Sequence, residues 1–177
     1  MKFRTGTASN APLLINQFES HFIAQLPETY QLLRHANLVV HPAVAHVVLY
    51  GSRGLAGRAR PDSDVNLFLV LHPTQVPSSP AREHFLRMLL GLTLGHWQAS
   101  VNLDAAAVFD LRGCGLRCFD RTRYDARPCR WGNGVDCFGI YKIRSGYSGY
   151  VRTGLQVRRM YPCIRIWRNR VYPVGET

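Results

Sequence analysis

The stretch that decides the fold is residues 50–70, which read Tyr50-Gly51-Ser52-Arg53-Gly54-Leu55-Ala56-Gly57-Arg58-Ala59-Arg60-Pro61-Asp62-Ser63-Asp64-Val65-Asn66-Leu67-Phe68-Leu69-Val70. An apolar run that begins at Ala45 ends at Gly51-Ser52, and a turn-rich basic loop follows. A second apolar run begins directly after Asp64. Two strands joined in this way place a small-residue turn and a carboxylate at one edge of a sheet. Backbone N–H groups in such turns hold phosphate oxygens, and magnesium prefers oxygen ligands.

This stretch resembles the signature of the nucleotidyltransferase superfamily that includes DNA polymerase beta and the minimal nucleotidyltransferases. The signature is Gly-Ser, a spacer, and then Asp-apolar-Asp. Gly51 and Ser52 match the turn, and Asp64 matches the first carboxylate after a spacer of eleven residues. Asn66 stands where the second carboxylate is expected.

Strand alternation supports this mapping, because side chains two residues apart share a face. Asp64 and Asn66 are therefore expected to point the same way, while Val65 points into the core. The third carboxylate implied by the resemblance is expected from a strand over 100–109, inside which Asp104 is the only acidic residue.

The resemblance implies a role for each matched residue. Asp64, Asn66 and Asp104 hold the catalytic positions, and Asp64 and Asp104 are the expected magnesium ligands. Nucleotide phosphates are expected at the turn and its basic loop, that is, at Gly51, Ser52, Arg53 and Arg58. Members of the family use two magnesium ions, one to activate the attacking hydroxyl and one to hold the triphosphate and the leaving pyrophosphate.

The resemblance thus implies magnesium-dependent transfer of a nucleoside monophosphate from a nucleoside triphosphate to a hydroxyl acceptor. Asn66 offers a neutral carbonyl where this chemistry uses an anion. Loss of one group that stabilises transition-state charge typically costs about 100-fold or more in rate. Two interpretations stay open: an enzyme weakened by Asn66, and a catalytically impaired nucleotide- or nucleic-acid-binding module that acts with a partner.

The order of elements predicts an α+β fold. We expect helices over 12–25 and 28–35, strands over 45–50 and 65–71, a helix over 81–94 and a strand over 100–109. This order indicates a mixed sheet with helices packed on one face. Such a sheet matches the nucleotidyltransferase-like core that the resemblance implies. In the helix over 81–94, the residues expected to share the buried face are Phe85, Met88, Leu89 and Leu92.

The chain divides by composition at residue 111. Residues 1–111 form the expected core and hold 8 basic and 7 acidic groups, a net charge of +1. Residues 112–177 hold 14 basic and 4 acidic groups and so carry +10 of the total net charge of +11. Glycine-punctuated runs such as 138–143 and 163–167 predict a β-rich C-terminal appendage packed on the core. Its arginines suit nucleic acid or a partner protein, or reflect only an arginine-rich composition.

Composition sets the broad class. With 46% hydrophobic and 19% charged residues among 177, the chain is expected to be a globular protein of one domain. Apolar runs fall short of the roughly 20 residues of a membrane span, so we expect a cytoplasmic protein without membrane contact. The five cysteines, Cys114, Cys118, Cys129, Cys137 and Cys163, lack a Cys-x2-Cys pair, which favours buried thiols over a zinc site.

Overall fold

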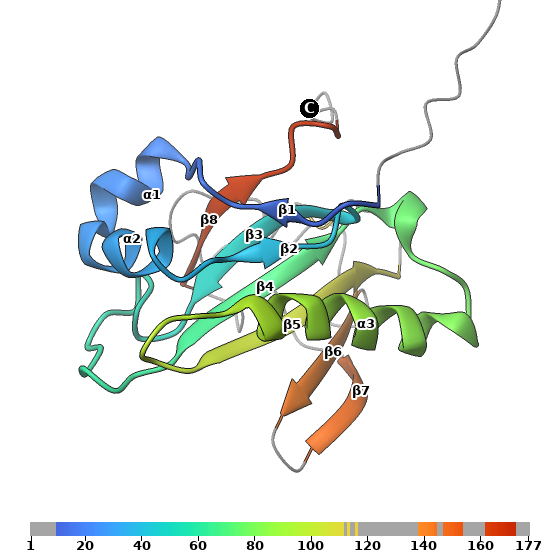
Figure 1. Cartoon of the computed structure of the whole chain (residues 1–177). Coiled ribbons are helices and arrows are strands. Elements are labelled where there is room, and N and C mark those ends of the chain that lie inside the picture. Colours follow the sequence, from blue (N-terminus) through green and yellow to red (C-terminus); the bar gives the residue numbers. More distant parts are fainter. Residues whose placement is uncertain are drawn as a thin grey trace, which may run out of the picture.

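The protein has an α+β fold built on one mixed sheet of six strands, in the order β7-β6-β5-β4-β3-β8 (Figure 1). The computed structural model describes residues 10–111, 113, 116, 138–144, 147–153 and 162–172. The strands of this sheet are β3 (Val44–Tyr50), β4 (Val65–Leu71), β5 (Leu103–Asp110), β6 (Phe138–Arg144), β7 (Tyr147–Thr153) and β8 (Cys163–Arg168). Within this sheet β4 and β5 are parallel, and every other neighbouring pair is antiparallel.

The helices cover one face of the sheet. They are α1 (Ser20–Gln25), α2 (Pro27–Arg34) and α3 (Ala81–His96), with a short 3-10 turn η1 (Pro73–Gln75) after β4. The helix residues Phe22 and Leu89 share the main core with Leu67 and Leu69 of β4. On the opposite face lies a smaller core, which contains Phe68 and no described helix residue. The expected alternation of β4 is therefore confirmed.

Helix α3 provides the crossover that the parallel pair β4–β5 requires. Its buried residues are Leu86, Leu89, Leu90 and Thr93. The predicted buried face was partly wrong, because Met88 is 44% exposed. The leucines of α3 are spread over most of its circumference, so the apolar pattern does not define one buried stripe. Packing against the sheet decides which residues are buried.

The predicted helix over 12–25 was wrong in its first half. Leu13–Leu14 form a short strand, β1, which pairs antiparallel with β2 (Val39–Val40). The N–H of Ile15 also donates to the carbonyl of Leu38 at 2.9 Å, and α1 begins only at Ser20. Buried backbone groups need partners. A neighbouring strand supplies these partners here, so the helix-like spacing of the apolar residues does not correspond to a helix.

The described strands of the C-terminal region belong to the core sheet. Strands β6 and β7 extend it beyond β5, and β8 extends it beyond β3 (Figure 1). The prediction of β-structure holds for these strands, but the idea of an appendage on a finished core does not describe them. Cys163 is buried as a free thiol. The other four cysteines lie outside the described residues.

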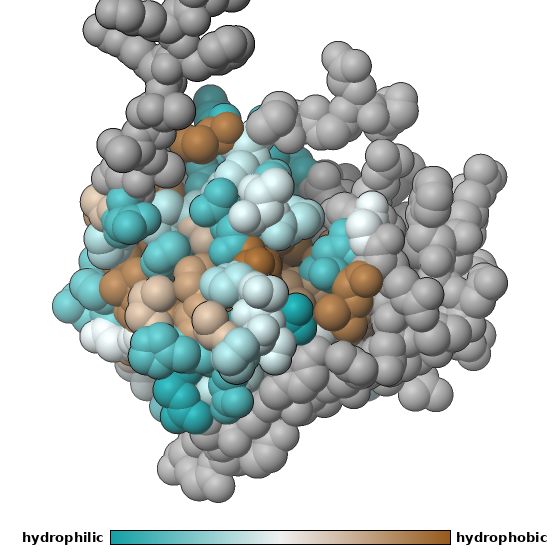
Figure 2. All heavy atoms as spheres, turned by 90° about the vertical axis from the view of Figure 1, so that its right-hand side faces the viewer, coloured by the Kyte–Doolittle hydropathy of each residue, from teal (hydrophilic) through white to brown (hydrophobic). Residues whose placement is uncertain are grey.

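The described surface carries few large exposed apolar side chains, namely Leu14, Met88 and Val171. Figure 2 shows one face, on which hydrophobic residues are interspersed with hydrophilic ones. Among the described residues, no helix has the length and apolar character that crossing a membrane requires.

His46 on β3 gives the folded state a measurable dependence on pH. Burial, and then the nearby Arg165 and Arg168 of β8, lower its pKa from 6.5 to about 3. Between these values the unfolded chain binds a proton at His46 that the folded chain excludes. The folded state should therefore lose stability as the pH falls below 6.5, by at most about 1.4 kcal/mol per pH unit.

The variant His46→Phe should lose less stability than the wild type between pH 7 and pH 4.5, measured by urea unfolding. His84→Gln removes an exposed histidine of α3 and should keep the wild-type dependence. Equal pH dependence in wild type and His46→Phe would contradict the assignment.

Candidate functional site

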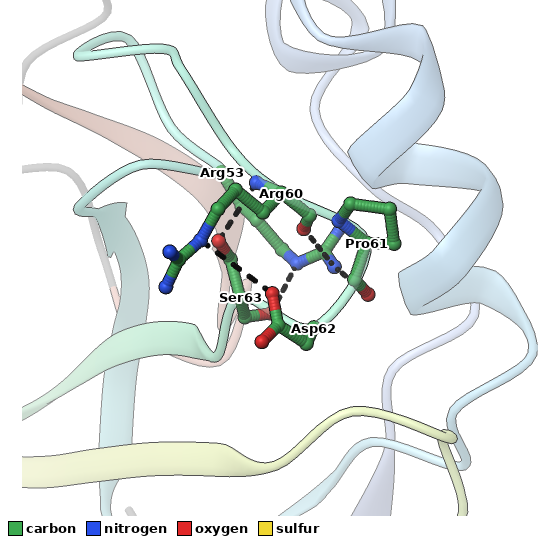
Figure 3. Close-up of polar contacts among 5 residues, drawn as sticks. All are labelled: Arg53, Arg60, Pro61, Asp62 and Ser63. Atoms are coloured by element: carbon green, nitrogen blue, oxygen red, sulfur yellow. Dashed lines mark hydrogen bonds and ion pairs between the residues drawn. The ribbon is translucent and has the colours of Figure 1, made fainter.

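Arg53 holds the loop between β3 and β4 in shape. Its Nε donates to the carbonyl of Ser63 at 2.6 Å, and its Nη2 donates to the carbonyls of Arg60 and Pro61 at 3.2 and 3.0 Å (Figure 3). From α2, the hydroxyl of Thr29 donates to the carbonyl of Arg53 at 2.6 Å. These bonds tie both ends of the loop to each other and to the helix layer.

In the structure, three hydrogen bonds direct the Arg53 guanidinium to the loop backbone. Its role in the site is to position the loop. Arg58 is exposed on the same loop, with a positive φ of 67°. Its guanidinium is therefore open to a ligand in solution.

Three side chains lie in a row across adjacent strands at the end of the sheet that carries this loop. Tyr50 of β3 pairs with Asn66 of β4, and Asn66 pairs with Asp104 of β5. Parity places all three on the sheet face opposite the helices, the face of Phe68. We call these residues the polar row. The sequence correctly predicted that Asn66 and Asp104 would meet, although 38 positions separate them.

Gly51 lies against Asn66 of the polar row. Its φ is +77°, a conformation that favours glycine, and a Cβ built there would lie 2.5 Å from Nδ2 of Asn66. The backbone of the turn therefore approaches the Asn66 amide as closely as the atoms allow. The Gly51 turn is therefore in direct contact with Asn66, which stands at the second carboxylate position of the signature.

Lys142 completes the site and was not predicted. Its Nζ lies 3.2 Å from Oδ2 of Asp104 and donates to the Tyr50 hydroxyl at 3.4 Å. Both charged side chains are largely buried, with exposures of 16% and 22%. The Tyr50 ring stacks on Phe68 at 3.9 Å between centroids. The available signal was the alternation of 138–143, which places Lys142 on the face opposite the buried Tyr141.

Asp64 lies at the rim of the polar row. It is exposed and precedes β4, and the next residue, Val65, donates its N–H to the carbonyl of Asn102 at 2.9 Å. Asp64 therefore lies opposite Asn102. Asn102 comes two residues before Asp104, which corresponds to about 7 Å along the strand direction of β5. Ser52 follows Gly51 and is partly exposed.

The donor set does not suit a pair of magnesium ions. Asn66 is neutral, and the Asp104 carboxylate already has an ammonium at 3.2 Å. Asp64 and Asp104 can act as two anionic ligands for one ion that arrives with substrate phosphates, which is a common form of magnesium binding. The Lys142 ammonium competes with that ion for the Asp104 carboxylate.

No family model, curated protein or solved structure matches the chain.

Gly51→Ala should disturb the polar row. Both Gly51 and Gly57 have a positive φ, of 77° and 71°, so alanine at either position meets a similar backbone cost. Only at Gly51 does the new Cβ also collide with Asn66, because nothing lies within 4 Å of a Cβ at Gly57. We expect Gly51→Ala to lower the free energy of unfolding by about 1–3 kcal/mol more than Gly57→Ala does. Equal losses in denaturant titrations would refute the close approach.

Lys142→Met should destabilise the fold, because it removes the ammonium partner of a largely buried carboxylate. A loss of about 1–3 kcal/mol is expected, and Asp104→Asn in the same chain should recover part of it. The exposed ion pair of Asp62 with Arg60, at 3.6 Å, provides the control. Asp62→Asn should change the free energy of unfolding by about 0.5 kcal/mol or less. A double-mutant cycle without coupling between residues 104 and 142 would disprove the pairing.

Proposed function

We propose that the chain is a nucleotidyltransferase-like protein that binds a nucleoside triphosphate beside the polar row. The observation that supports this most is the juxtaposition of Gly51, Asn66 and Asp104 on consecutive strands of the sheet. These are the positions that the resemblance assigns to the phosphate-binding turn and to two of the three catalytic carboxylates.

The phosphates are expected on the Gly51 turn. Backbone N–H groups of a tight turn bind phosphate oxygens, and the Arg58 guanidinium adds an exposed positive charge from the same loop. Lys142 supplies a second positive group, since its ammonium lies beside Asp104 and can donate hydrogen bonds to phosphate oxygens. When a triphosphate binds, Lys142 can exchange the Asp104 carboxylate for a phosphate oxygen.

The reaction class is transfer of a nucleoside monophosphate. The oxygen of an acceptor hydroxyl forms a bond to the α-phosphorus and loses its proton to solvent water, the bond from that phosphorus to the bridging oxygen breaks, and pyrophosphate leaves. A magnesium ion held by Asp64, Asp104 and the phosphates would neutralise charge on the triphosphate. The formal charge of Asp64, Asn66, Asp104 and Lys142 together is −1, against −3 for three carboxylates, so we expect weak metal binding and slow transfer.

The second candidate is nucleotide binding without turnover. The ion pair between Lys142 and Asp104 favours it, because a resident ammonium takes the place beside Asp104 that a metal ion would need. The two candidates share the same site and differ in whether pyrophosphate is released.

Calorimetry with ATP or GTP, with and without magnesium, tests the proposal. Wild type should bind weakly, and Asn66→Asp should increase magnesium-dependent affinity by about tenfold or more, because it adds an anion beside Asp104. Asn102→Asp adds the same charge beside Asp64, outside the polar row, and should have a smaller effect. Pyrophosphate release from Asn66→Asp would favour the enzyme.

The outcomes separate the proposals. Absence of nucleotide binding in both wild type and Asn66→Asp would overturn the proposed function. Binding without pyrophosphate release in the presence of varied hydroxyl acceptors would favour the second candidate. An equal gain from Asn66→Asp and Asn102→Asp would mean that net charge, and not the polar row, governs metal binding.

A further inference from the structure

A second candidate site lies along the outer edge of β8. A cavity of about 710 Å³ opens between the segment 13–20 and β8. We call it the β8 cavity. Its lining residues are Leu13, Leu14, Asn16, Gln17, Phe18, Glu19, Ser20, Arg165, Trp167, Arg168, Asn169 and Arg170.

The β8 cavity is separate from the polar row. Strand β8 runs antiparallel to β3, so that Tyr50 pairs with Cys163 while His46 pairs with Arg168. The four residues from Tyr50 to His46 correspond to about 13 Å along the strand. The two sites therefore lie toward opposite ends of the same pair of strands.

Positive charge dominates the β8 cavity. Three arginines line it, whereas its one acidic residue, Glu19, is already 3.2 Å from Nε of Arg165. Within the described parts of the chain, neither Arg168 nor Arg170 forms an ion pair. Their charges are therefore available to an anion. The same field acts on buried His46, whose pKa is lowered first by burial and then by Arg165 and Arg168.

The backbone that carries these arginines is held in place. The Asn169 side chain is buried, and its Nδ2 donates to the carbonyls of Pro42 and Val44, both at 3.2 Å. Its Oδ1 accepts from the N–H of Val171 at 3.1 Å. Arg168 and Arg170 flank this anchor, so binding an anion does not require the backbone to be ordered first.

The other side of the cavity is also attached to β8. The N–H of Glu19 donates to the carbonyl of Ile166 at 2.9 Å, and Nε2 of His21 bonds to the carbonyl of Arg165 at 2.7 Å. These bonds connect the start of α1 to the edge strand (Figure 1). Both walls of the β8 cavity are therefore tied together by hydrogen bonds.

We propose that the β8 cavity binds single-stranded nucleic acid. Guanidinium groups match phosphate oxygens, and proteins that bind single strands combine such groups with aromatic rings on which bases stack. Here Trp167, a partly exposed residue that packs against the main core and lines the cavity, lies between Arg165 and Arg168 in sequence, and the amides of Asn16 and Gln17 add donors and acceptors for base edges. The aromatic ring and the amides favour nucleic acid over an acidic peptide, which needs only the charges.

Fluorescence anisotropy with a labelled oligothymidine tests the proposal in the full chain. Affinity should fall steeply with salt, because each phosphate contact with a single strand contributes about −0.7 to the slope of log K against log salt. Arg168→Ala with Arg170→Ala should weaken binding at least about tenfold and make the slope shallower by about 1.4. Arg87→Ala removes an arginine of α3 and should change neither quantity.

Two further measurements keep the result interpretable. Arg168→Lys with Arg170→Lys preserves the charge and should retain the salt slope. This control separates loss of charge in the alanine variant from loss of its folded structure. Polyglutamate should displace the oligonucleotide poorly. Unchanged affinity in the alanine variant, no binding at about 50 mM salt, or equal displacement by polyglutamate would each overturn the proposal. This inference does not depend on nucleotide binding at the polar row.

Discussion

The structure depends on the position of β4 between an antiparallel neighbour, β3, and a parallel one, β5. This central strand is buried on both faces: Leu67 and Leu69 pack under the helices, and Phe68 packs on the opposite side. Parallel pairing with β5 requires a crossover, which α3 provides. Antiparallel pairing with β3 brings the Gly51 turn against Asn66. The loop, the polar row and the helix layer all follow from the pairing of this one strand.

A carboxylate in that row cannot remain buried without a partner. Asp104 is mostly covered by protein, and a buried charge is costly unless it is paired. Lys142 on the neighbouring β6 supplies the pairing and reaches Tyr50 as well. The ion pair stabilises the sheet and at the same time reduces the negative charge available to a metal. The same interaction thus supports the fold and limits the chemistry of the site.

Much of the core was predictable because its signals are local. The apolar runs of β3 and β4 follow a two-residue period, so the face of each side chain along these strands could be predicted. Asp104 was singled out through the resemblance, and the pairing of β5 with β4 places it beside Asn66. The helix over 12–25 and the buried face of α3 were predicted less well. In both cases apolar residues occur at spacings that suit more than one arrangement, and contacts with distant strands decide between them. The sequence position of Arg53 does not reveal that loop carbonyls accept its hydrogen bonds.

The sequence by itself determined strands β3, β4, β5, β6 and β8 and the alternation of side chains along β4, because these depend on residues close together in the chain. Only the tertiary structure decided which charges meet. Lys142 is 38 positions from Asp104 and 92 from Tyr50. The β8 cavity joins residues near 16 to residues near 168. Strand order and register set such contacts, and they arise from burial and hydrogen bonding summed over the whole sheet rather than from any local pattern.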